Sequence, residues 1–327
     1  MYTLTEIQEI INSEVEKESE RLKKSKPENL YFPVNYILGL KGKKLRPALV
    51  LLSYNLFSEK IESALPAAMA IEIFHNFTLL HDDIMDKAEL RRNKSTVHNK
   101  FSENAAILSG DVMSFISFQY LLKSETPQLK SLIQLFTKTA IEVCEGQQYD
   151  MDFENQQDVS EKEYLKMIRL KTAVLLACSL KSGALLAGAE NNAAIALYNF
   201  GINLGLAFQL QDDLLDSFGN ENTFGKKIGG DILSNKKTFL LVKALELVRA
   251  DQKKKLLHEI NKTDFIPENK IDTIKSIFND LGIQEIAKEK IDAYFLQANN
   301  CLNDLPVAEN KKIQLRKLAQ TMSNRDY

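Results

Sequence analysis

The sequence has few residues that break helices and no linker that would separate two domains. Only 7 of its 327 residues are proline and 13 are glycine, whereas 44% are apolar. Such a shortage of turn residues favours long helices over many short strands. Domains of about 150 residues are common, but no stretch rich in glycine, serine or proline divides this chain. We therefore expect a single all-α domain over residues 1–327.

The sequence also lacks a cysteine pattern, a strong net charge and a signal segment. Its three cysteines, Cys144, Cys178 and Cys301, are widely spaced and odd in number, which suits neither a disulfide framework nor a zinc site. A net charge of −2 provides no overall field that would attract nucleic acid. No apolar signal core opens the chain. We expect a cytoplasmic protein without stable membrane insertion.

Two near-copies of one acidic hexapeptide are the most informative feature that is present. They are His81-Asp82-Asp83-Ile84-Met85-Asp86 and Gln211-Asp212-Asp213-Leu214-Leu215-Asp216. Each ends an apolar segment, residues 64–86 and about 194–216, of the kind found in helices buried inside a bundle. Acids so close together at a helix C-terminus repel one another and oppose the helix dipole. Bound cations would offset this charge.

Helical geometry places the acids of each motif on one face of its helix. The first face carries His75, Asp82 and Asp86, with Asp83 one step round, and the second carries Gln209, Asp212, Asp213 and Asp216. If the two helices pack as neighbours, the two acidic faces oppose each other across a cavity. All six acids are hard oxygen donors, and neither motif contains a cysteine or an EF-hand loop. Magnesium is the ion that fits best.

Basic residues accompany each acidic motif, which indicates a phosphate-bearing substrate. They are Arg91, Arg92 and Lys94 after the first motif, and Lys226, Lys227, Lys236 and Lys237 after the second. The pair Lys171-Thr172 lies in an apolar helical run, residues 164–186. Alone, this pair is more often the polar side of an amphipathic helix.

A basic connector, Lys41-Gly42-Lys43-Lys44-Leu45-Arg46, precedes the helix that Pro47 would start. Anions bind well where a helix N-terminus meets lysine and arginine. A connector of this kind, taken alone, is more often a solvated basic turn. Because the chain also contains the acidic motifs and the other basic groups, we treat the connector as a candidate anion site.

Together these features resemble the trans-isoprenyl diphosphate synthases, or polyprenyl synthetase family. The resemblance runs from about Gly42 to Thr238 and includes both Asp-Asp-x-x-Asp motifs, the connector, the Arg-Arg pair, the Lys-Thr pair and the Lys-Lys-Thr segment ending at Thr238. It implies an isoprenoid synthase-type bundle of many antiparallel helices around a deep central cavity. It also implies a homodimer and three Mg²⁺ ions, with Mn²⁺ able to substitute. The implied reaction joins isopentenyl diphosphate to an allylic diphosphate and releases pyrophosphate.

The resemblance also assigns roles to individual residues. The predicted metal ligands are Asp82, Asp83, Asp86, Asp212, Asp213 and Asp216. The predicted ligands of the leaving diphosphate are Arg91, Lys171, Lys236 and either Lys226 or Lys227, between which the spacing to Asp231 does not decide. The predicted ligands of isopentenyl diphosphate are Lys43, Arg46, His75 and Arg92. Thr172 and Gln209 match positions whose oxygens face the carbocation.

Two local departures from the family pattern affect turns. Lys41-Gly42 stands where the family has Gly-Gly, and Asn93 stands where it has glycine after the Arg-Arg pair. Asparagine tolerates a left-handed backbone better than other non-glycine residues. We therefore expect the second turn to be retained.

The length of the product is predicted from residues just before the first motif. In the family a bulky residue there forms the floor of the substrate pocket, and Phe77, followed by Thr78, takes that place. With no two-residue insertion in the motif, this resembles enzymes that make C15 to C20 products, with geranylgeranyl diphosphate slightly favoured over farnesyl diphosphate. Ideal helix geometry turns Phe77 about 140° from Asp82, so the assignment depends on the resemblance.

Several alternative functions fit the motifs less well. A class I terpene cyclase normally carries a different second metal motif, and a metal-dependent phosphohydrolase would need more histidines than the 4 present. A longer-chain polyprenyl synthase and a noncatalytic regulatory subunit of a heteromer share the motifs' general pattern. Regulatory subunits generally lose an acidic motif or the basic ligands, whereas this chain retains both. A purely structural helical protein would not explain two acidic triads with matched basic residues.

Overall fold

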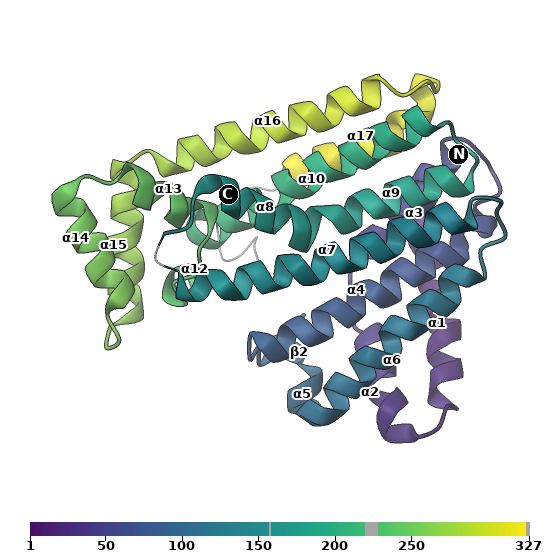
Figure 1. Ribbon diagram of the computed structural model, residues 1–327, viewed down its shortest axis with the longest axis horizontal. Coiled ribbons are helices and arrows are strands. Elements are labelled where there is room, and N and C mark those ends of the chain that lie inside the picture. The colour runs from purple at the N-terminus through teal and green to yellow at the C-terminus, as the bar shows by residue number, and fades with distance from the viewer. Residues whose placement is uncertain (157, 220–227, 325–327) are drawn as a thin grey trace. The chain divides into compact units, whose positions relative to one another are not determined.

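The computed structural model describes residues 1–156, 158–219 and 228–324 (Figure 1). Helices occupy most of these residues, which confirms the predicted all-α class. Within the described ranges the strands are limited to one short hairpin, β1 (Leu90–Arg91) and β2 (Lys94–Ser95). The chain divides into two compact units. The prediction of a single domain over residues 1–327 stays a prediction.

The first unit comprises Met1–Lys138, Leu175–Tyr198 and Leu305–Leu315. Its elements are α1 (Leu4–Lys23), α2 (Glu28–Leu38), α3 (Leu45–Asn55), the 3₁₀ turn η1 (Ile61–Ala64), α4 (Leu65–Met85), α5 (Val97–Lys100), α6 (Glu103–Leu122), and parts of α7 (Leu129–Asn155), α9 (Val174–Leu186), α10 (Asn191–Phe218) and α17 (Glu309–Ser323).

Local sequence explains where these helices begin. A capping box starts α1: the Thr3 hydroxyl accepts the Glu6 N–H at 3.3 Å, and the Glu6 carboxylate accepts the Thr3 N–H at 2.7 Å. Helix α3 begins at Leu45, two residues before the predicted start at Pro47. A proline is tolerated there because the first turn of a helix has no hydrogen-bond acceptor for its N–H. The predicted helices over residues 64–86 and 194–216 are confirmed as α4 and α10.

Helix α4 packs along α6 and against α3 (Figure 1). The close approach of α4 and α6 depends on Gly110, where a β-carbon would lie 2.2 Å from the His81 imidazole. Aromatic rings extend this core. The Phe74 ring lies 5.2 Å from that of Phe136, which in turn lies 5.2 Å from that of Phe118.

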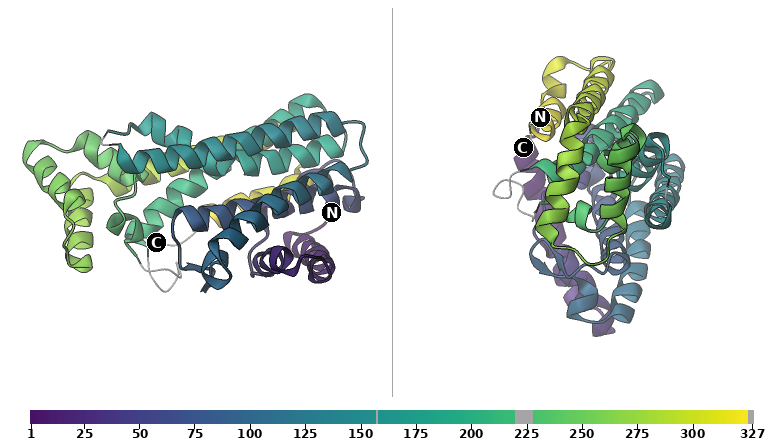
Figure 2. Two further views of the ribbon diagram at one scale, coloured as in Figure 1. Left: turned by 60° about the horizontal axis from the view of Figure 1, so that its bottom comes forward. Right: turned by 90° about the vertical axis from the view of Figure 1, so that its left-hand side faces the viewer.

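The second unit comprises Thr139–Val174, Asn199–Asp304 and Arg316–Tyr327. Besides the remaining parts of α7, α10 and α17, it contains α8 (Glu161–Ile168), the π turn η2 (Arg169–Ala173), α12 (Gly230–Leu233), α13 (Phe239–Leu247), α14 (Ala250–Asn261), α15 (Pro267–Asp280) and α16 (Ile283–Asn303). Helices α14 and α15 pack as a pair, which faces the viewer in the right-hand view of Figure 2, and α15 also contacts α12, α13 and α16.

The predicted helical run over residues 164–186 is interrupted by the π turn. Its backbone is crowded by α7: a β-carbon on Gly146 would lie 2.2 Å from the Lys171 nitrogen. A π turn inserts an extra residue into the helix and recurs at functional sites. Here it contains Lys171 and Thr172, which the sequence singled out as a polar pair.

Three segments are long and apolar enough to cross a membrane, judged by length and composition. They are Ile61–Met85, Glu103–Leu122 and Asn191–Phe218, and 61%, 39% and 56% of their most apolar windows are buried. Packing inside the protein therefore accounts for most of the apolar surface in the first and third segments. Helix α6 differs because less than half of its apolar window is buried.

Replacing Phe136 with alanine should lower the free energy of unfolding by about 3–5 kcal/mol, because the ring is 1% exposed and its loss leaves a cavity between two other rings. Urea unfolding would measure the change. Leu296→Ala is the control, since that side chain is 62% exposed and should change stability by less than about 0.5 kcal/mol. Equal losses in the two variants would contradict this account of the core.

Candidate active site

The first acidic motif lies at the C-terminal end of α4, where its members differ in burial. The Asp83 side chain is 2% exposed and that of Asp82 is 20% exposed, whereas Asp86 is exposed. Arg91 donates to Asp83 Oδ1 from Nε at 2.9 Å and from Nη2 at 2.5 Å, and its Nη2 lies 3.5 Å from Asp82. Burial raises the pKa of Asp83, and the Arg91 guanidinium opposes that rise. The structure thus brings Arg91 to the predicted acids.

The hairpin after this motif turns through two left-handed residues. Leu90 pairs with Ser95 and Arg91 with Lys94. Between them Arg92 has φ +53° and Asn93 has φ +59°, as in the two-residue turns that favour asparagine and glycine. The expected left-handed turn at Asn93 is confirmed, whereas the left-handed Arg92 was not predicted.

Arg92 connects this hairpin to the basic connector. Its Nη1 donates to the Leu40 carbonyl oxygen at 3.1 Å. Its guanidinium covers Gly42, where a β-carbon would lie 2.7 Å from Arg92 Cζ. Glycine at this position therefore leaves room for the arginine.

The connector borders an open hollow of about 470 Å³ in the first unit. It is lined by Gln8, Asn12, Lys41, Gly42, Lys43 and Lys44. Nearby, Arg46 Nη1 lies 3.1 Å from His75 Nε2. Burial and the charges of Arg46 and Arg92 hold the pKa of His75 well below its ordinary value. A neutral imidazole can therefore accept the arginine's hydrogen bond while the site keeps its positive charge.

The second acidic motif, on α10, includes one almost fully buried carboxyl, that of Asp213. This side chain accepts hydrogen bonds from the Tyr164 hydroxyl, from the Phe239 N–H at 3.0 Å and from Gln209 Nε2 at 3.2 Å. Burial raises its pKa to about 7 in spite of these three donors. The bond to Gln209 confirms that residues 209 and 213 share a helix face. Asp213 thereby anchors α10 to α8 and to the start of α13.

The other two acids of this motif are half-buried. Asp216 Oδ2 accepts the N–H of Asp231 at 2.9 Å, and its carbonyl oxygen accepts the N–H of Gly229 at 2.6 Å. Gly229 has φ +85°, a backbone conformation that is disfavoured for residues other than glycine. Asp216 thus fixes the start of α12, while Asp212 lies one turn earlier on α10.

An acid that the sequence analysis missed, Asp150 on α7, gathers two of the predicted lysines. Its Oδ2 lies 2.6 Å from Lys171 Nζ and 3.7 Å from Lys236 Nζ. These two ammonium groups hold the pKa of Asp150 below its ordinary value against the effect of burial. No pattern in the sequence marks Asp150; in the structure it lies four residues after Gly146, the residue at which α7 approaches the π turn.

The remaining predicted residues of the second unit lie together. The Thr172 hydroxyl donates to Gln209 Oε1 at 3.1 Å. Because Gln209 in turn donates to Asp213, the three side chains form a continuous hydrogen-bonded chain. The structure therefore brings the Lys-Thr pair of the π turn to the second acidic motif.

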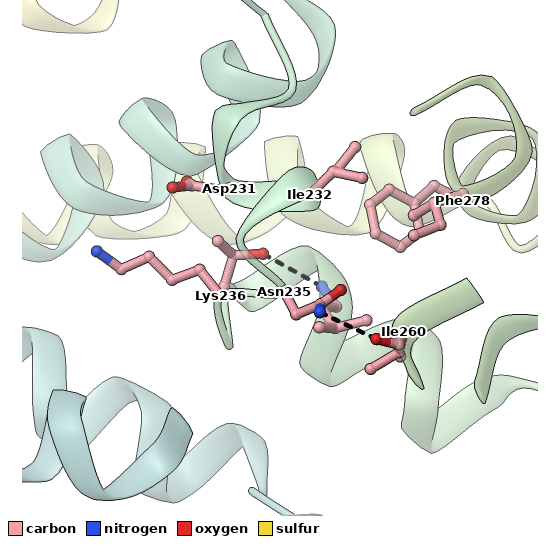
Figure 3. Close-up of a pocket in the computed structure, with 9 residues that line it drawn as sticks. Asp231, Ile232, Asn235, Lys236, Ile260 and Phe278 are labelled. Atoms are coloured by element: carbon pink, nitrogen blue, oxygen red, sulfur yellow. Dashed lines mark hydrogen bonds between the residues drawn. The ribbon is translucent and has the colours of Figure 1, made fainter. Parts of the chain in front are cut away.

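The loop that carries Lys236 is held by a polar network beside a small cavity. Asn235 has φ +54°, and its Nδ2 donates to the Ile260 carbonyl oxygen at 2.9 Å. Figure 3 shows Lys236 and Asp231 extending away from Phe278 and Ile232. The cavity that these apolar residues line has a volume of about 10 Å³, enough for about one water molecule. The hydrogen bond of Asn235 anchors the loop, and the cavity is too small for a substrate.

For two pairs of predicted residues, the structure does not establish the predicted role. Lys226 and Lys227 lie outside the described residues. Phe77 is half-buried, with its ring 5.4 Å from that of Phe74 and 4.8 Å from the His81 imidazole. The Thr78 hydroxyl donates to the His75 carbonyl oxygen at 2.8 Å. The role of Phe77 and Thr78 in chain length stays a prediction.

The carboxylates fit a hard divalent cation by their chemistry. Among the described residues, no three acids, histidines or cysteines converge into a ready-made ligand cluster. Magnesium does not need one, because it keeps several waters and binds through one or two carboxylates together with substrate phosphates. Asp82, Asp86, Asp212 and Asp216 all retain exposed surface that could take part in such sharing.

Comparisons with known proteins agree with this arrangement. A family model described as polyprenyl synthetase matches residues 27–281. The geranylgeranyl diphosphate synthase of Methanosarcina mazei is 37% identical over 94% of this chain and 93% of its own length. A crystal structure of geranylgeranyl pyrophosphate synthase matches with a TM-score of 0.93 and 42% identity, covering 100% of both chains.

A third match includes bound ligands. It is the polyprenyl synthase of Caulobacter crescentus, whose crystal structure is complexed with calcium and isoprenyl diphosphate. It is 26% identical, with a TM-score of 0.86, and the match covers 98% of this chain and 97% of the other. The motifs, the helical fold and these likenesses lead to one conclusion: the chain belongs to the polyprenyl synthetase family.

Proposed function

We propose that this chain condenses isopentenyl diphosphate with an allylic diphosphate to give an all-trans C15 to C20 prenyl diphosphate and pyrophosphate. Two observations carry this proposal. Arg91 contacts Asp82 and Asp83 of the first acidic motif. In the second unit the π turn supplies Lys171, which pairs with Asp150, and Thr172, which is bonded through Gln209 to Asp213 of the second motif. The similar geranylgeranyl diphosphate synthases support the short-chain class and disfavour the longer-chain and regulatory alternatives.

The leaving diphosphate would be bound by charge-assisted hydrogen bonds from Arg91, Lys171 and Lys236 and from either Lys226 or Lys227. Such bonds are about twice as strong as neutral ones. Since negative charge grows on the diphosphate as its bond to carbon breaks, donors already in place favour the transition state over the bound substrate. The Asp150 carboxylate keeps Lys171 and Lys236 near each other until the diphosphate arrives.

Enzymes of this family use a divalent metal, and we propose three Mg²⁺ ions, with Mn²⁺ able to replace them. The ligands would be Asp82, Asp83, Asp86, Asp212, Asp213 and Asp216. When bound, the ions would neutralise the charge that develops on the leaving group. Asp83 and Asp213 are the most buried of the six, and their contacts with Arg91 and Tyr164 fix the helix ends that carry the others.

Isopentenyl diphosphate would be held by Lys43, Arg46, His75 and Arg92. The neutral His75 accepts from Arg46 at Nε2, which leaves its proton on Nδ1 for a second hydrogen bond. The double bond of this substrate attacks the allylic cation, so no protein nucleophile is needed. The departing pyrophosphate would remove the final proton.

Thr172 and Gln209 would stabilise the carbocation through their oxygen atoms. The Thr172 hydroxyl donates to the Gln209 amide oxygen, and the Gln209 amide nitrogen donates to Asp213. This chain fixes the orientation of both polar groups. Their dipoles can therefore face a positive charge without reacting with it.

We also propose that the protein is a cytoplasmic homodimer. On α6, Leu108, Phe115 and Leu122 recur every seven residues and are 59%, 69% and 58% exposed. Positions seven apart lie on one stripe of a helix, and an exposed apolar stripe of this kind marks an interaction surface. A second copy of the chain fits it, because the same stripe on both partners is self-complementary about a twofold axis.

The central test of function is condensation by the purified protein. With Mg²⁺, labelled isopentenyl diphosphate and a panel of allylic diphosphates, the wild type should form C15 to C20 products. Asp212→Asn should reduce kcat by about 10²-fold or more while the thermal midpoint of unfolding stays near that of the wild type. EDTA should abolish turnover and added Mg²⁺ restore it.

Asp292→Asn is the matched control, because Asp292 is an exposed acid on α16 of the same unit. This variant should keep the wild-type rate. A wild type that forms no product with any allylic diphosphate would revive the regulatory-subunit alternative. An Asp212→Asn variant with normal turnover would remove Asp212 from the catalytic site.

The floor of the pocket can be tested separately through Phe77. Phe77→Ala should shift the product distribution toward longer chains, since removing the ring would deepen the space for the growing prenyl group. Chromatography of the dephosphorylated products measures this. Phe101→Ala removes another partly exposed ring of the first unit and should leave the distribution unchanged. An unaltered distribution for Phe77→Ala would place the floor elsewhere.

The dimer is tested by placing a charge in the middle of the α6 stripe. Phe115→Lys should convert a dimeric protein into a monomer in multi-angle light scattering, because burying an unpaired ammonium in an apolar interface is strongly unfavourable. Leu296→Lys, at an exposed leucine on α16, should remain dimeric. A monomeric wild type that instead binds lipid vesicles would contradict the proposal.

A further inference from the structure

Lys44 and Glu72 form a buried ion pair that the proposed mechanism does not use. Lys44 Nζ lies 2.8 Å from Glu72 Oε1, and the two side chains are 5% and 2% exposed. Removing two charges from water costs several kcal/mol per ion, and well-packed apolar residues can often replace such a pair without loss of stability. Stability alone is therefore a weak explanation for the pair.

The pair belongs to a network that joins the connector to α4. Asn76 Nδ2 donates to Glu72 Oε1 at 2.7 Å and to the Glu72 carbonyl oxygen at 2.8 Å. Lys44 Nζ also lies 3.4 Å from the Leu38 carbonyl oxygen. The Glu72 carboxylate is thus bonded to the residue that precedes α3 and to the next turn of its own helix.

This network lies beside residues proposed to bind isopentenyl diphosphate. Lys44 directly follows Lys43 and stands two residues before Arg46. On α4, Glu72 and Asn76 flank His75, whose Nε2 lies 3.1 Å from Arg46 Nη1. One turn of α4 therefore carries both Glu72, which binds Lys44, and His75, a proposed ligand of the substrate.

The backbone at Lys44 gives an independent reason to expect a positioning role. Lys44 has φ +47°, a left-handed conformation that is disfavoured for a non-glycine residue. A second contact holds the same segment, because Gln8 Nε2 donates to the Lys43 carbonyl oxygen at 2.5 Å. Because the backbone is disfavoured here, the side-chain anchor determines whether the turn persists.

We propose that the Lys44–Glu72–Asn76 network is a positioning device for isopentenyl diphosphate, which fixes Lys43 and Arg46 relative to His75 without contacting the substrate. The inference rests on the proposed function, which assigns those three residues to this diphosphate. Lys44 borders the same hollow as Lys43, yet its ammonium is bound to Glu72. A direct phosphate ligand would instead need that charge turned toward the hollow.

The decisive variant is the double substitution Lys44→Met with Glu72→Leu, which removes both charges together. Such replacements usually retain folding, so the thermal midpoint should stay near that of the wild type. The KM for isopentenyl diphosphate should nevertheless rise about tenfold or more, since small displacements of binding groups have effects of this size. The KM for the allylic diphosphate should change less than about twofold.

Two single variants separate positioning from direct binding. Lys44→Arg can still pair with Glu72 and should remain within about threefold of the wild-type KM. Glu72→Gln removes the anchor's negative charge and should raise the KM for isopentenyl diphosphate. If Lys44 were a direct ligand, Glu72→Gln would release its ammonium and lower that KM, which would overturn the proposal.

The control and the remaining outcomes complete the test. Lys312→Met also removes a buried lysine of the first unit, one paired with Glu309, and should leave both KM values unchanged. A folded double variant with a wild-type KM, or equal rises for both substrates, would refute the positioning role. If the double variant does not fold, Glu72→Asp keeps the charge but shortens its reach, and an unchanged KM would refute the role as well. A wild type that does not consume isopentenyl diphosphate would instead refute the proposed function.

Discussion

The structure depends on how carboxylates are accommodated at the ends of apolar helices. Asp83 and Asp213 occupy equivalent places in the two motifs, and both are nearly inaccessible to water. An ionised carboxylate in such a place requires either a cation or several hydrogen-bond donors. The two motifs differ in which of these groups accompanies the buried carboxyl. The residues that supply the cation or the donors belong to the candidate site.

In the first motif the compensation is ionic, and in the second it is supplied by neutral groups. Arg91 binds Asp83 with two nitrogens, whereas Asp213 receives a phenol, an amide side chain and a backbone N–H. Burial raises the pKa of Asp213 to about 7, the Asp231 carboxylate adds to the rise, and the three neutral donors oppose it. A nearby divalent cation would favour the ionised form.

The sequence predicted the parts of this arrangement that depend on local periodicity. Apolar spacing located α4 and α10, and helical geometry placed Gln209 on the face of Asp213. The π turn was not predictable, because it arises where Gly146 of a different helix approaches Lys171. Asp150 was missed for the same reason: its role follows from tertiary contacts with two lysines that lie 21 and 86 positions along the chain, which single-sequence patterns do not reveal.

Backbone strain shows a similar dependence on tertiary contacts. In the described ranges the non-glycine residues with positive φ are Lys44, Lys87, Arg92, Asn93 and Asn235. Each adjoins or lies within two residues of a proposed ligand. Side chains hold several of them: Lys44 through Glu72, Arg92 through the Leu40 carbonyl, and Asn235 through the Ile260 carbonyl and Lys270.

Strain of this kind persists only where surrounding contacts outweigh it. Glycine would relieve it at each position, but glycine at Lys44 or Arg92 would also remove the cation that makes the contact. The same residue therefore has the disfavoured backbone and supplies the contact that compensates for it. This coupling accounts for the presence of lysine and arginine at sharp turns where the backbone alone would favour glycine.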